Sequence, residues 1–355
     1  MTFGAGAGNM PAMRRVLTAA GLSFLLGVVP AVSGMAQDEF GLPEDWDSAD
    51  FQDVQDAVSR VMPQIVRLGN EQEWNAFWAQ VESVLRSQSL EDMEWMTSSV
   101  GVAYEYVNSV PEARPLADWL KQRLDYFDMA DLAIRQIPAP SSAVPALSGS
   151  GLNLPTAIRA ATPLVQKSRP ASEPIREKRL AIVRSSDAWK TRLKGRALSP
   201  EAQRLVPWLK KVFNSEGTPQ RWVWMAEVES SLNPEARSPV GAVGLFQLMP
   251  ETAKRFGLKI FPFDERIKPA KNARAAAQYL NILYRQFGSW SLALAAYNAG
   301  EGRVGRALKN NDVKTFEDVA RYLPLETQMY VPKVMATAAL REDQAKGVPY
   351  AYWMP

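Results

Sequence analysis

Two glutamates near the end of a predicted helix are the first residues in this sequence that could do acid–base chemistry. Thr218 and Pro219 signal the start of that helix, and Glu227 and Glu229 lie toward its end. Because helical positions two residues apart point about 200° away from each other, the two carboxyls cannot share one face. A glutamate on the apolar face would have a raised pKa, since burial disfavours its charged form, and this suits a general acid near neutral pH. A lone glutamate near a helix end is more often a solvated surface residue, so the pair needs support from other segments.

Three further segments bring amides, phenols and a carboxyl next to turns or onto one helix face. Gln247 follows a glycine-punctuated loop, and glycine lets backbone approach a ligand closely. Tyr297 and Asn298 stand side by side at the end of a predicted helix. Glu326 and Tyr330 are four residues apart, which places them on one helix face. Taken one at a time, these segments also fit a turn, a helix cap and a structural ion pair.

The composition narrows the chemistry further, because the 355-residue sequence contains no Cys and no His. Without Cys there is no disulfide framework, no Cys-ligated zinc or iron–sulfur cluster and no thiolate nucleophile. Without His there is no imidazole base, no Ser-His-Asp triad and no histidine metal site. Any catalysis must therefore use carboxylates, Lys, Tyr, hydroxyls or amides, with an oxygen-ligated cation as the remaining metal option. We expect no cofactor and no metal-binding residue.

Residues 1–36 have the pattern of a secretory signal peptide rather than of a folded element. Two arginines at 14–15 precede a fourteen-residue apolar stretch, 16–29, which is too short to span a bilayer. Gly34 and Ala36 place small residues at the −3 and −1 positions of a cleavage site. No Cys follows the apolar stretch, which excludes lipid attachment at a lipobox. We therefore expect an exported, periplasmic or cell-envelope protein that is not an integral membrane protein after signal removal; an uncleaved anchor or a buried helix is the alternative.

The charges divide the rest of the chain into an acidic and a basic part. Residues 37–137 contain 20 Asp and Glu against 7 Lys and Arg, a balance of −13, whereas residues 138–355 contain 18 against 32, a balance of +14. A basic part attracts anionic polymers such as nucleic acid, or an anionic cell envelope. Its basic residues are scattered without a run of five, so we expect no nucleic-acid partner.

Hydrophobic spacing and turn residues predict the domain boundaries. Residues 37–137 carry apolar side chains at three- to four-residue spacing, which predicts an acidic helical region of unknown role. Residues 138–175 are rich in Pro, Ser and Gly and predict a linker, in which the apolar interval 157–165 could lie on a domain surface. Residues 176–355 then carry every candidate residue above. Because the linker lies between, we expect the acidic region to be separate and dispensable for chemistry.

Residues 176–355 are punctuated as an all-helical domain. Ser199 and Pro200 start one predicted helix, Gly217 ends it, and residues 233–248 predict a loop or a small β element. The sequence shows no strand–helix–strand alternation, and this argues against a Rossmann-like or barrel fold. The predicted fold class is therefore all-α. Further helices are predicted at 250–256, 269–287, 290–299, 316–323 and 324–340.

Four of these segments occur in the order and spacing of a known set of motifs. They are Glu229-Ser230, Gly244-Leu245-Phe246-Gln247, Ala296-Tyr297-Asn298-Ala299-Gly300 and Glu326-Thr327-Gln328-Met329-Tyr330-Val331. With them the sequence resembles, over about residues 186–340, the soluble lytic transglycosylase family, which shares the goose-type lysozyme fold and acts on bacterial peptidoglycan. Residues 300–304 and 330–333 are most similar to the membrane-bound type D branch. That branch usually carries a lipobox and carboxy-terminal sugar-binding repeats, of which this sequence shows neither.

The resemblance implies a lysozyme-like (goose-type) catalytic domain with a single catalytic residue, Glu229. That acid would protonate the glycosidic oxygen between N-acetylmuramic acid and N-acetylglucosamine. It would then accept the proton of the muramyl 6-hydroxyl as a 1,6-anhydro ring closes, and this hydroxyl competes with water through its high effective concentration. The residues that the resemblance implies in substrate binding are Ser230, Gly244, Phe246, Gln247, Tyr297, Asn298, Glu326 and Tyr330.

Individual roles follow from the same resemblance. Tyr330 is expected near the catalytic carboxyl and the developing charge, and Gln247 and Asn298 at the amides of the sugars. Ser230 is expected at the carboxyl or at the muramyl group, and Phe246 as an apolar wall. For Tyr297 and Glu326, pocket lining or structural support fits the motifs as well as direct contact with the substrate does.

Two other functions stay open at this stage. A hydrolytic lysozyme on the same fold would need a second acid to activate water, and Glu251, Asp264 and Glu301 are the candidates. A catalytically silent peptidoglycan-binding scaffold would normally lack the acid that Glu229 supplies. A role for residues 38–137 in binding a cell-wall protein is compatible with either enzyme.

Overall fold

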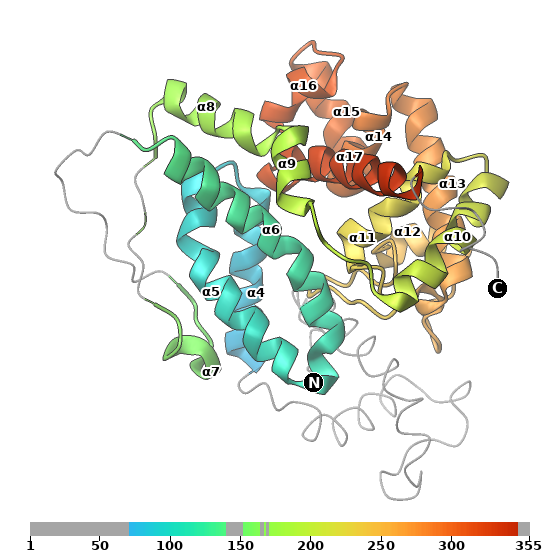
Figure 1. Cartoon of the computed structure of the whole chain (residues 1–355), viewed down its shortest axis with the longest axis horizontal. Coiled ribbons are helices and arrows are strands. Elements are labelled where there is room, and N and C mark those ends of the chain that lie inside the picture. Colours follow the sequence, from blue (N-terminus) through green and yellow to red (C-terminus); the bar gives the residue numbers. More distant parts are fainter. Residues whose placement is uncertain (1–70, 140–151, 164–166, 168–169, 347–355) are drawn as a thin grey trace, which may run out of the picture.

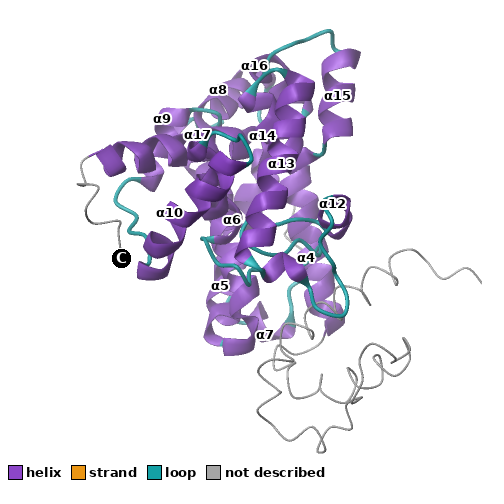
Figure 2. Cartoon of the chain, turned by 90° about the vertical axis from the view of Figure 1, so that its right-hand side faces the viewer, coloured by secondary structure: helices purple, strands orange, loops and turns teal. Residues whose placement is uncertain are grey.

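The described part of this computed structural model is built from helices and loops. It covers four stretches of the chain, residues 71–139, 152–163, 167 and 170–346. The predicted signal peptide, residues 1–36, lies outside the described residues. Within them β structure is limited to two isolated bridges, Arg237 with Val243 and Val243 with Leu248, so residues 233–248 are a loop with a minimal β element. The view in Figure 2 accordingly shows helices and loops, which confirms the all-α prediction.

Three helices on one side of the molecule form what we name the N-terminal layer (Figure 1). They are α4 (Glu71–Arg86), α5 (Leu90–Ser109) and α6 (Arg114–Gln136). Ser89 starts α5, because its side chain accepts a hydrogen bond from the Asp92 amide. Aromatic rings fill the space between the helices at centroid distances of 5.3 to 6.5 Å: Trp74, Trp78, Tyr106 and Trp119. The tryptophans of this set are buried, so they belong to the core.

The helices on the other side form the C-terminal bundle, α10 to α17 (Figures 1 and 2). Its centre is α14 (Trp290–Ala299), which packs between α13 (Pro269–Phe287) and α17 (Leu325–Lys346) because it is apolar around most of its circumference. The other helices are α10 (Pro200–Ser215), α11 (Met225–Ser230), α12 (Pro250–Arg255), α15 (Glu301–Asn310) and α16 (Phe316–Val319). Short 3-10 helices occupy Pro111–Ala113, Gln220–Trp224, Glu265–Ile267 and Ala320–Tyr322. No helix in the described part is both long enough and apolar enough to cross a membrane.

A shared apolar core joins the N-terminal layer to the C-terminal bundle. Buried residues of the layer pack against Val183 of α8 (Glu173–Val183), Trp189 of α9 (Ser186–Leu193) and Met329 of α17. One apolar cluster therefore crosses the boundary that the Pro/Ser-rich segment suggested. The prediction of a separate acidic region is wrong for the part of it that the structure describes.

A buried ion pair, which we name the α6–α17 seam, lies at the same contact. Lys333 of α17 is 0% exposed, and its Nζ lies 2.9 Å from Asp125 Oδ2 and donates to the Gln122 carbonyl oxygen at 2.6 Å. Arg196 donates to both carboxylate oxygens of Asp125. Burial raises the pKa of Asp125, but Lys333 and Arg196 outweigh burial and lower this pKa far below its ordinary value. Because removing one partner would leave a buried charge unpaired, the seam fixes how the two sides dock.

The described part of the predicted linker also lies on the N-terminal layer. Helix α7 (Thr156–Arg159) packs against α5, and Ile158 is buried in the shared core. The Thr156 amide and hydroxyl both donate to the Glu73 carboxylate. The apolar interval 157–165 therefore does contact a domain surface, as far as its residues are described.

The loop at 233–248 is held in shape by a buried arginine. Arg266 is fully buried, pairs with Asp264, and donates through Nη1 to the carbonyl oxygens of Gly241 at 2.7 Å and Leu248 at 2.9 Å. These two bonds tie together both ends of the glycine-punctuated segment. The arginine thereby fixes the loop that ends in the candidate amide.

Gly244 is required in this loop by space and by backbone conformation. Its φ is +89°, and a Cβ at this position would lie 2.2 Å from the Arg266 carbonyl oxygen and 2.4 Å from Asn272 Nδ2. Asn272 is itself fixed, because its Oδ1 accepts a hydrogen bond from the Phe246 amide at 2.9 Å. The glycine therefore allows the loop backbone to lie directly against the start of α13.

Removing the N-terminal layer should prevent folding, although the sequence alone predicts that a chain beginning near Ser172 folds and cleaves. The deletion would expose Trp189 and Met329 and leave Lys333 buried without Asp125, which costs about 3–5 kcal/mol for the charge alone. We expect residues 71–355 to be soluble and residues 172–355 to aggregate or to lose near-UV circular dichroism. Cooperative unfolding of a soluble 172–355 fragment would contradict this expectation.

Gly244→Ala should destabilise the protein more than a matched glycine substitution does. Gly257 is the control, because its φ is also positive, at +77°, and no atom lies within 4 Å of the place that a Cβ would take there. Gly257→Ala should cost about 1–2 kcal/mol, the cost of a left-handed backbone for a side chain with a Cβ. Gly244→Ala should cost at least about twice as much, since backbone must also move. Urea unfolding of both variants measures the difference, and equal costs would show that the close contact is unimportant.

Candidate active site

Glu229 lies at the end of α11, directly before a tight turn. Ser231 and Leu232 have left-handed backbone angles, with φ of 58° and 63°, which is uncommon for residues other than glycine. The Leu232 amide donates back to the Ala226 carbonyl oxygen at 3.0 Å, as in a Schellman-type helix end. The turn ends the helix at Ser230 and so fixes where the glutamate side chain leaves the backbone.

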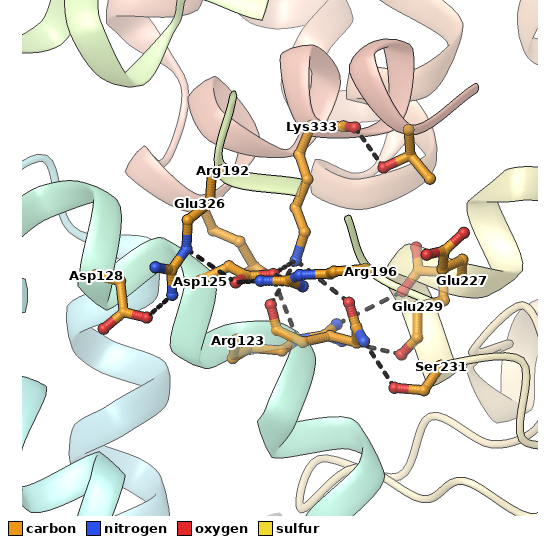
Figure 3. A network of polar contacts seen from close by, with 12 residues as sticks. Arg123, Asp125, Asp128, Arg192, Arg196, Glu227, Glu229, Ser231, Glu326 and Lys333 are labelled. Carbon is orange, nitrogen blue, oxygen red and sulfur yellow. Dashed lines mark hydrogen bonds and ion pairs between the residues drawn. The ribbon is translucent and has the colours of Figure 1, made fainter. Parts of the chain in front are cut away.

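The carboxyl of Glu229 is buried, with 4% of the residue exposed, and two elements other than its own hold it. Tyr330 of α17 donates its hydroxyl to Oε1 at 2.7 Å. Arg123 of α6 donates through Nη1 to the Glu229 carbonyl oxygen at 3.0 Å, and its Nη2 lies 3.5 Å from Oε2. Figure 3 shows Arg123 of α6 beside Glu229 of α11. The sequence prediction that Tyr330 lies near Glu229 agrees with this geometry.

Burial dominates the electrostatics of this carboxyl. Burial raises the pKa of Glu229, Arg123 and the Tyr330 hydrogen bond oppose the rise, and the charge of Glu326 adds to it. The net shift is upward, so the protonated form is favoured over that of an exposed glutamate. Burial likewise raises the pKa of Tyr330 well above 10.0, which keeps its hydroxyl protonated as a donor. A neutral carboxylic acid beside a permanent donor can serve as a general acid.

Arg123 is the site residue that the sequence analysis missed. Its guanidinium lies 4.9 Å from the ring centroid of Trp119, one turn earlier on α6, and its Nε lies 3.7 Å from Glu326 Oε1. It belongs to none of the four motifs and lies 106 positions before Glu229. The available signal was an arginine four residues after a tryptophan in a helix with several charged residues of both signs, which does not by itself indicate a site.

Glu227 is held elsewhere, as its helical position predicts. Its carboxylate accepts hydrogen bonds from Nε and Nη2 of Arg341, the former at 2.8 Å, near the end of α17. The two glutamates of α11 therefore have different partners. Of the pair, Glu229 is the one that faces Tyr330.

Ser230 connects the helix to the loop rather than facing a ligand. The residue is 0% exposed, and its hydroxyl lies 2.8 Å from the Leu245 carbonyl oxygen and 2.9 Å from that of Ala226. A hydroxyl can donate to one of the two at a time, and either bond is internal to the protein. The expected contact between Ser230 and substrate is therefore replaced by a positioning role for α11.

Phe246 and Gly244 are also structural in this arrangement. Phe246 is 0% exposed and packs against Phe213 of α10 at a centroid distance of 5.1 Å, so it does not present an apolar wall to a ligand. Gly244 provides the close backbone contact described above. The motif at residues 244–247 thus shapes the loop, and its last residue, Gln247, carries the amide that could bind a ligand.

Gln247 presents a buried acceptor with no partner among the described residues. Its Nε2 donates to the carbonyl oxygens of Ala236 and Gly244, both at 3.0 Å, while its buried Oε1 accepts no hydrogen bond. Its own φ is +45°, which is an uncommon backbone angle for glutamine. An unmet buried acceptor costs about 1–3 kcal/mol, so a ligand amide that donates to Oε1 would recover this cost.

Tyr297 and Asn298 connect α14 to its neighbours. The Tyr297 hydroxyl donates to the Phe246 carbonyl oxygen at 2.7 Å, and Asn298 Oδ1 accepts from the Thr327 hydroxyl at 2.6 Å. Both residues are half-buried rather than enclosed. Tyr297 therefore supports the loop, and Asn298 keeps its Nδ2 amide group for further bonding.

In the described part of the chain, no group of three or more His, Cys, Asp or Glu side chains is placed to hold a metal ion. The polar groups that meet around Glu229 are a phenol, a guanidinium and a second carboxyl. With these groups alone, the arrangement can perform proton transfer by a carboxylic acid.

Residues 208–319 match the family model described as the transglycosylase SLT domain. The chain is 33% identical over 149 residues to the membrane-bound lytic murein transglycosylase D of Escherichia coli K12, covering 41% of this chain and 33% of that protein. It is 39% identical over 122 residues to the soluble lytic murein transglycosylase of Salmonella typhimurium, covering 32% of this chain and 19% of that protein. The matches thus span at most about a third of these relatives.

A comparison of folds finds an inactive mutant of the lytic transglycosylase Slt from Pseudomonas aeruginosa. The two chains are 22% identical, and the match covers 96% of this chain and 69% of that one with a TM-score of 0.38. A score this low does not establish a common overall arrangement. The similarity therefore rests on the sequence matches, in which residues 208–319 resemble the transglycosylase SLT domain.

Proposed function

We propose that this protein is a peptidoglycan lytic transglycosylase of the cell envelope, in which Glu229 acts alone as acid and then as base. The observation that carries the proposal is the buried carboxyl at the first motif position of an SLT domain, with its protonated form favoured and its Oε1 held by Tyr330. The substrate is proposed from the relatives, whose names identify them as lytic transglycosylases of murein.

In the first step Glu229 gives its proton to the glycosidic oxygen between N-acetylmuramic acid and N-acetylglucosamine. Because Tyr330 donates to Oε1, the proton is best carried by Oε2. The bond from the muramyl C1 to that oxygen breaks, and N-acetylglucosamine leaves with a new hydroxyl. The carboxylate that forms is stabilised by Tyr330 and by the charge of Arg123.

In the second step the Glu229 carboxylate takes the proton of the muramyl 6-hydroxyl. The 6-oxygen bonds to C1, closes the 1,6-anhydro ring and returns the enzyme to its starting protonation state. The hydroxyl belongs to the same sugar, so its effective concentration far exceeds that of a diffusing nucleophile. No second carboxylate and no activated water are needed.

Two amides are suited to hold the sugars in this reaction. Gln247 Oε1 is a buried acceptor without a partner among the described residues, which suits the N–H of an acetamido group. Asn298 keeps its Nδ2 as a donor, since Thr327 occupies its Oδ1. Together they match the donor and acceptor of an N-acetyl group.

A hydrolytic lysozyme is the second candidate, and the structure changes where its extra acid should be sought. Of the three acids named from the sequence, Glu251 pairs with Lys254, Glu301 with Arg255, and Asp264 with Arg266. The carboxyl that shares a partner with Glu229 is instead Glu326, through Arg123. Activation of water by Glu326 is therefore the specific form that the hydrolytic alternative takes.

Glu229→Gln should reduce cleavage of purified sacculi by about 10²–10⁴-fold, the usual contribution of a general acid, because glutamine keeps the shape but not the proton. The matched control is Glu227→Gln on the same helix, which should stay within about twofold of the wild type once any loss of stability from its Arg341 ion pair is allowed for. Circular dichroism and binding to sacculi should be unchanged for Glu229→Gln. An inactive Glu227→Gln together with an active Glu229→Gln would show that the catalytic acid is Glu227, on the other face of the helix.

The product distinguishes the two candidate reactions. Released fragments should end in 1,6-anhydro-N-acetylmuramic acid, lighter by one water than lysozyme products and without a reducing end. In heavy-oxygen water the lytic reaction leaves the cleaved sugar unlabelled, whereas hydrolysis places the label on it. Mass analysis that finds stoichiometric label would reject the lytic reaction and direct attention to Glu326→Gln.

A further inference from the structure

The guanidinium of Arg123 is enclosed between the two acids of the candidate site. Its Nη1 donates to the Glu229 carbonyl oxygen at 3.0 Å, its Nη2 lies 3.5 Å from Glu229 Oε2, and its Nε lies 3.7 Å from Glu326 Oε1. Trp119 covers one face of the guanidinium at 4.9 Å. The side chain is 8% exposed, so these contacts are shielded from solvent.

The charged and titratable groups around this carboxyl come from four other elements. Helix α6 contributes Arg123 and Tyr126, α17 contributes Glu326 and Tyr330, α14 contributes Tyr297, and α4 contributes Glu82, which acts on Arg123 and Glu326. Burial and Glu326 raise the pKa of Glu82, so it too resists ionisation. The guanidinium therefore sits among three carboxyl groups from three helices, and its positive charge acts on each of them.

We propose that Arg123 is a positioning residue of the active site, supplied by the N-terminal layer, which holds the Glu229 carboxyl toward Tyr330 and offsets the negative charge of Glu326. The proposal rests on the proposed function, because it assigns Arg123 to the step in which Glu229 exchanges its proton. It makes α6 part of the active site, although α6 lies outside residues 208–319 that match the SLT domain. The α6–α17 seam is what brings the guanidinium to this position, since Asp125 is two residues from Arg123.

The sign of the effect follows from the charges. Without Arg123 the ionised form of Glu229 loses a favourable neighbour, so the pKa of Glu229 rises further and the carboxyl keeps its proton to higher pH. Activity that requires the protonated acid then persists to higher pH, while the rate at its plateau falls because the carboxylate formed in the first step is less stable. Without the charge of Glu326 the opposite holds, and the pKa of Glu229 falls.

The test compares three variants of the full chain by two measurements. Titration of the Glu229 carboxyl, followed by ¹³C NMR and assigned with Glu229→Gln, measures its ionisation directly. The pH dependence of sacculus cleavage gives the pH at which activity falls on the alkaline side. We expect both to move up by about one pH unit in Arg123→Gln and down by a similar amount in Glu326→Gln. Arg192→Gln is the matched control, because Arg192 pairs with Asp125 and Asp128 of α6 without contacting Glu229.

If the role of Arg123 were only structural, its variant would lose activity or stability, but the pH at which activity falls on the alkaline side would not move. The proposal is overturned if Arg123→Gln leaves the titration of Glu229 unchanged. If Arg123→Gln does not fold, the shift in Glu326→Gln decides, since no downward movement would mean that the two acids are not coupled. The NMR titration needs no substrate, so a shifted Glu229 in a protein that releases no anhydro product would reject the proposed function and not this inference.

Discussion

A fully buried ammonium group needs an anion beside it, and in this fold that anion comes from the opposite side of the molecule. Lys333 of α17 finds Asp125 of α6, and with this pair the N-terminal layer and the C-terminal bundle take one defined position. Helix α17 also carries Tyr330 about one turn and Glu326 about two turns before Lys333. The same docking therefore sets the distance between the phenol, the guanidinium and the carboxyl of Glu229.

The carboxyl of Glu229 illustrates how burial and hydrogen bonding oppose each other in one site. Burial favours its neutral form, whereas Tyr330 and Arg123 favour its charged form. A site with burial alone would not release its proton readily, and a site with strong ion pairing alone would hold no proton to give. The long 3.5 Å contact between Arg123 Nη2 and Oε2 is consistent with this balance, because a closer bidentate pair would favour the anion more strongly.

Sequence reasoning succeeded where chemistry and local pattern coincide. Glu229 and Tyr330 were predicted together from motif order, and the helix punctuation of residues 176–355 predicted α13 and α14 with the bounds that the structure shows. Motif membership did not reveal which side chains face outward, so Ser230 and Phe246 were expected at the substrate but lie inside. Helix α15 was not predicted because glycines at 302 and 305 weaken a helical pattern. Arg123 could not be predicted, because its role depends on contacts across more than a hundred positions of sequence.

The seam also has a consequence for when this site can exist. Lys333 bonds to Gln122, 211 positions earlier in the chain, and Arg123 reaches Glu229 across 106 positions. Contacts of such separation form late, since a long loop must close before they contribute any stability. During synthesis on the ribosome, the apolar face of the N-terminal layer stays uncovered until α17 has been made. The complete constellation around Glu229 is thus assembled only when nearly the entire described chain has been made, so a partly synthesised protein has the acid without the groups that control its proton.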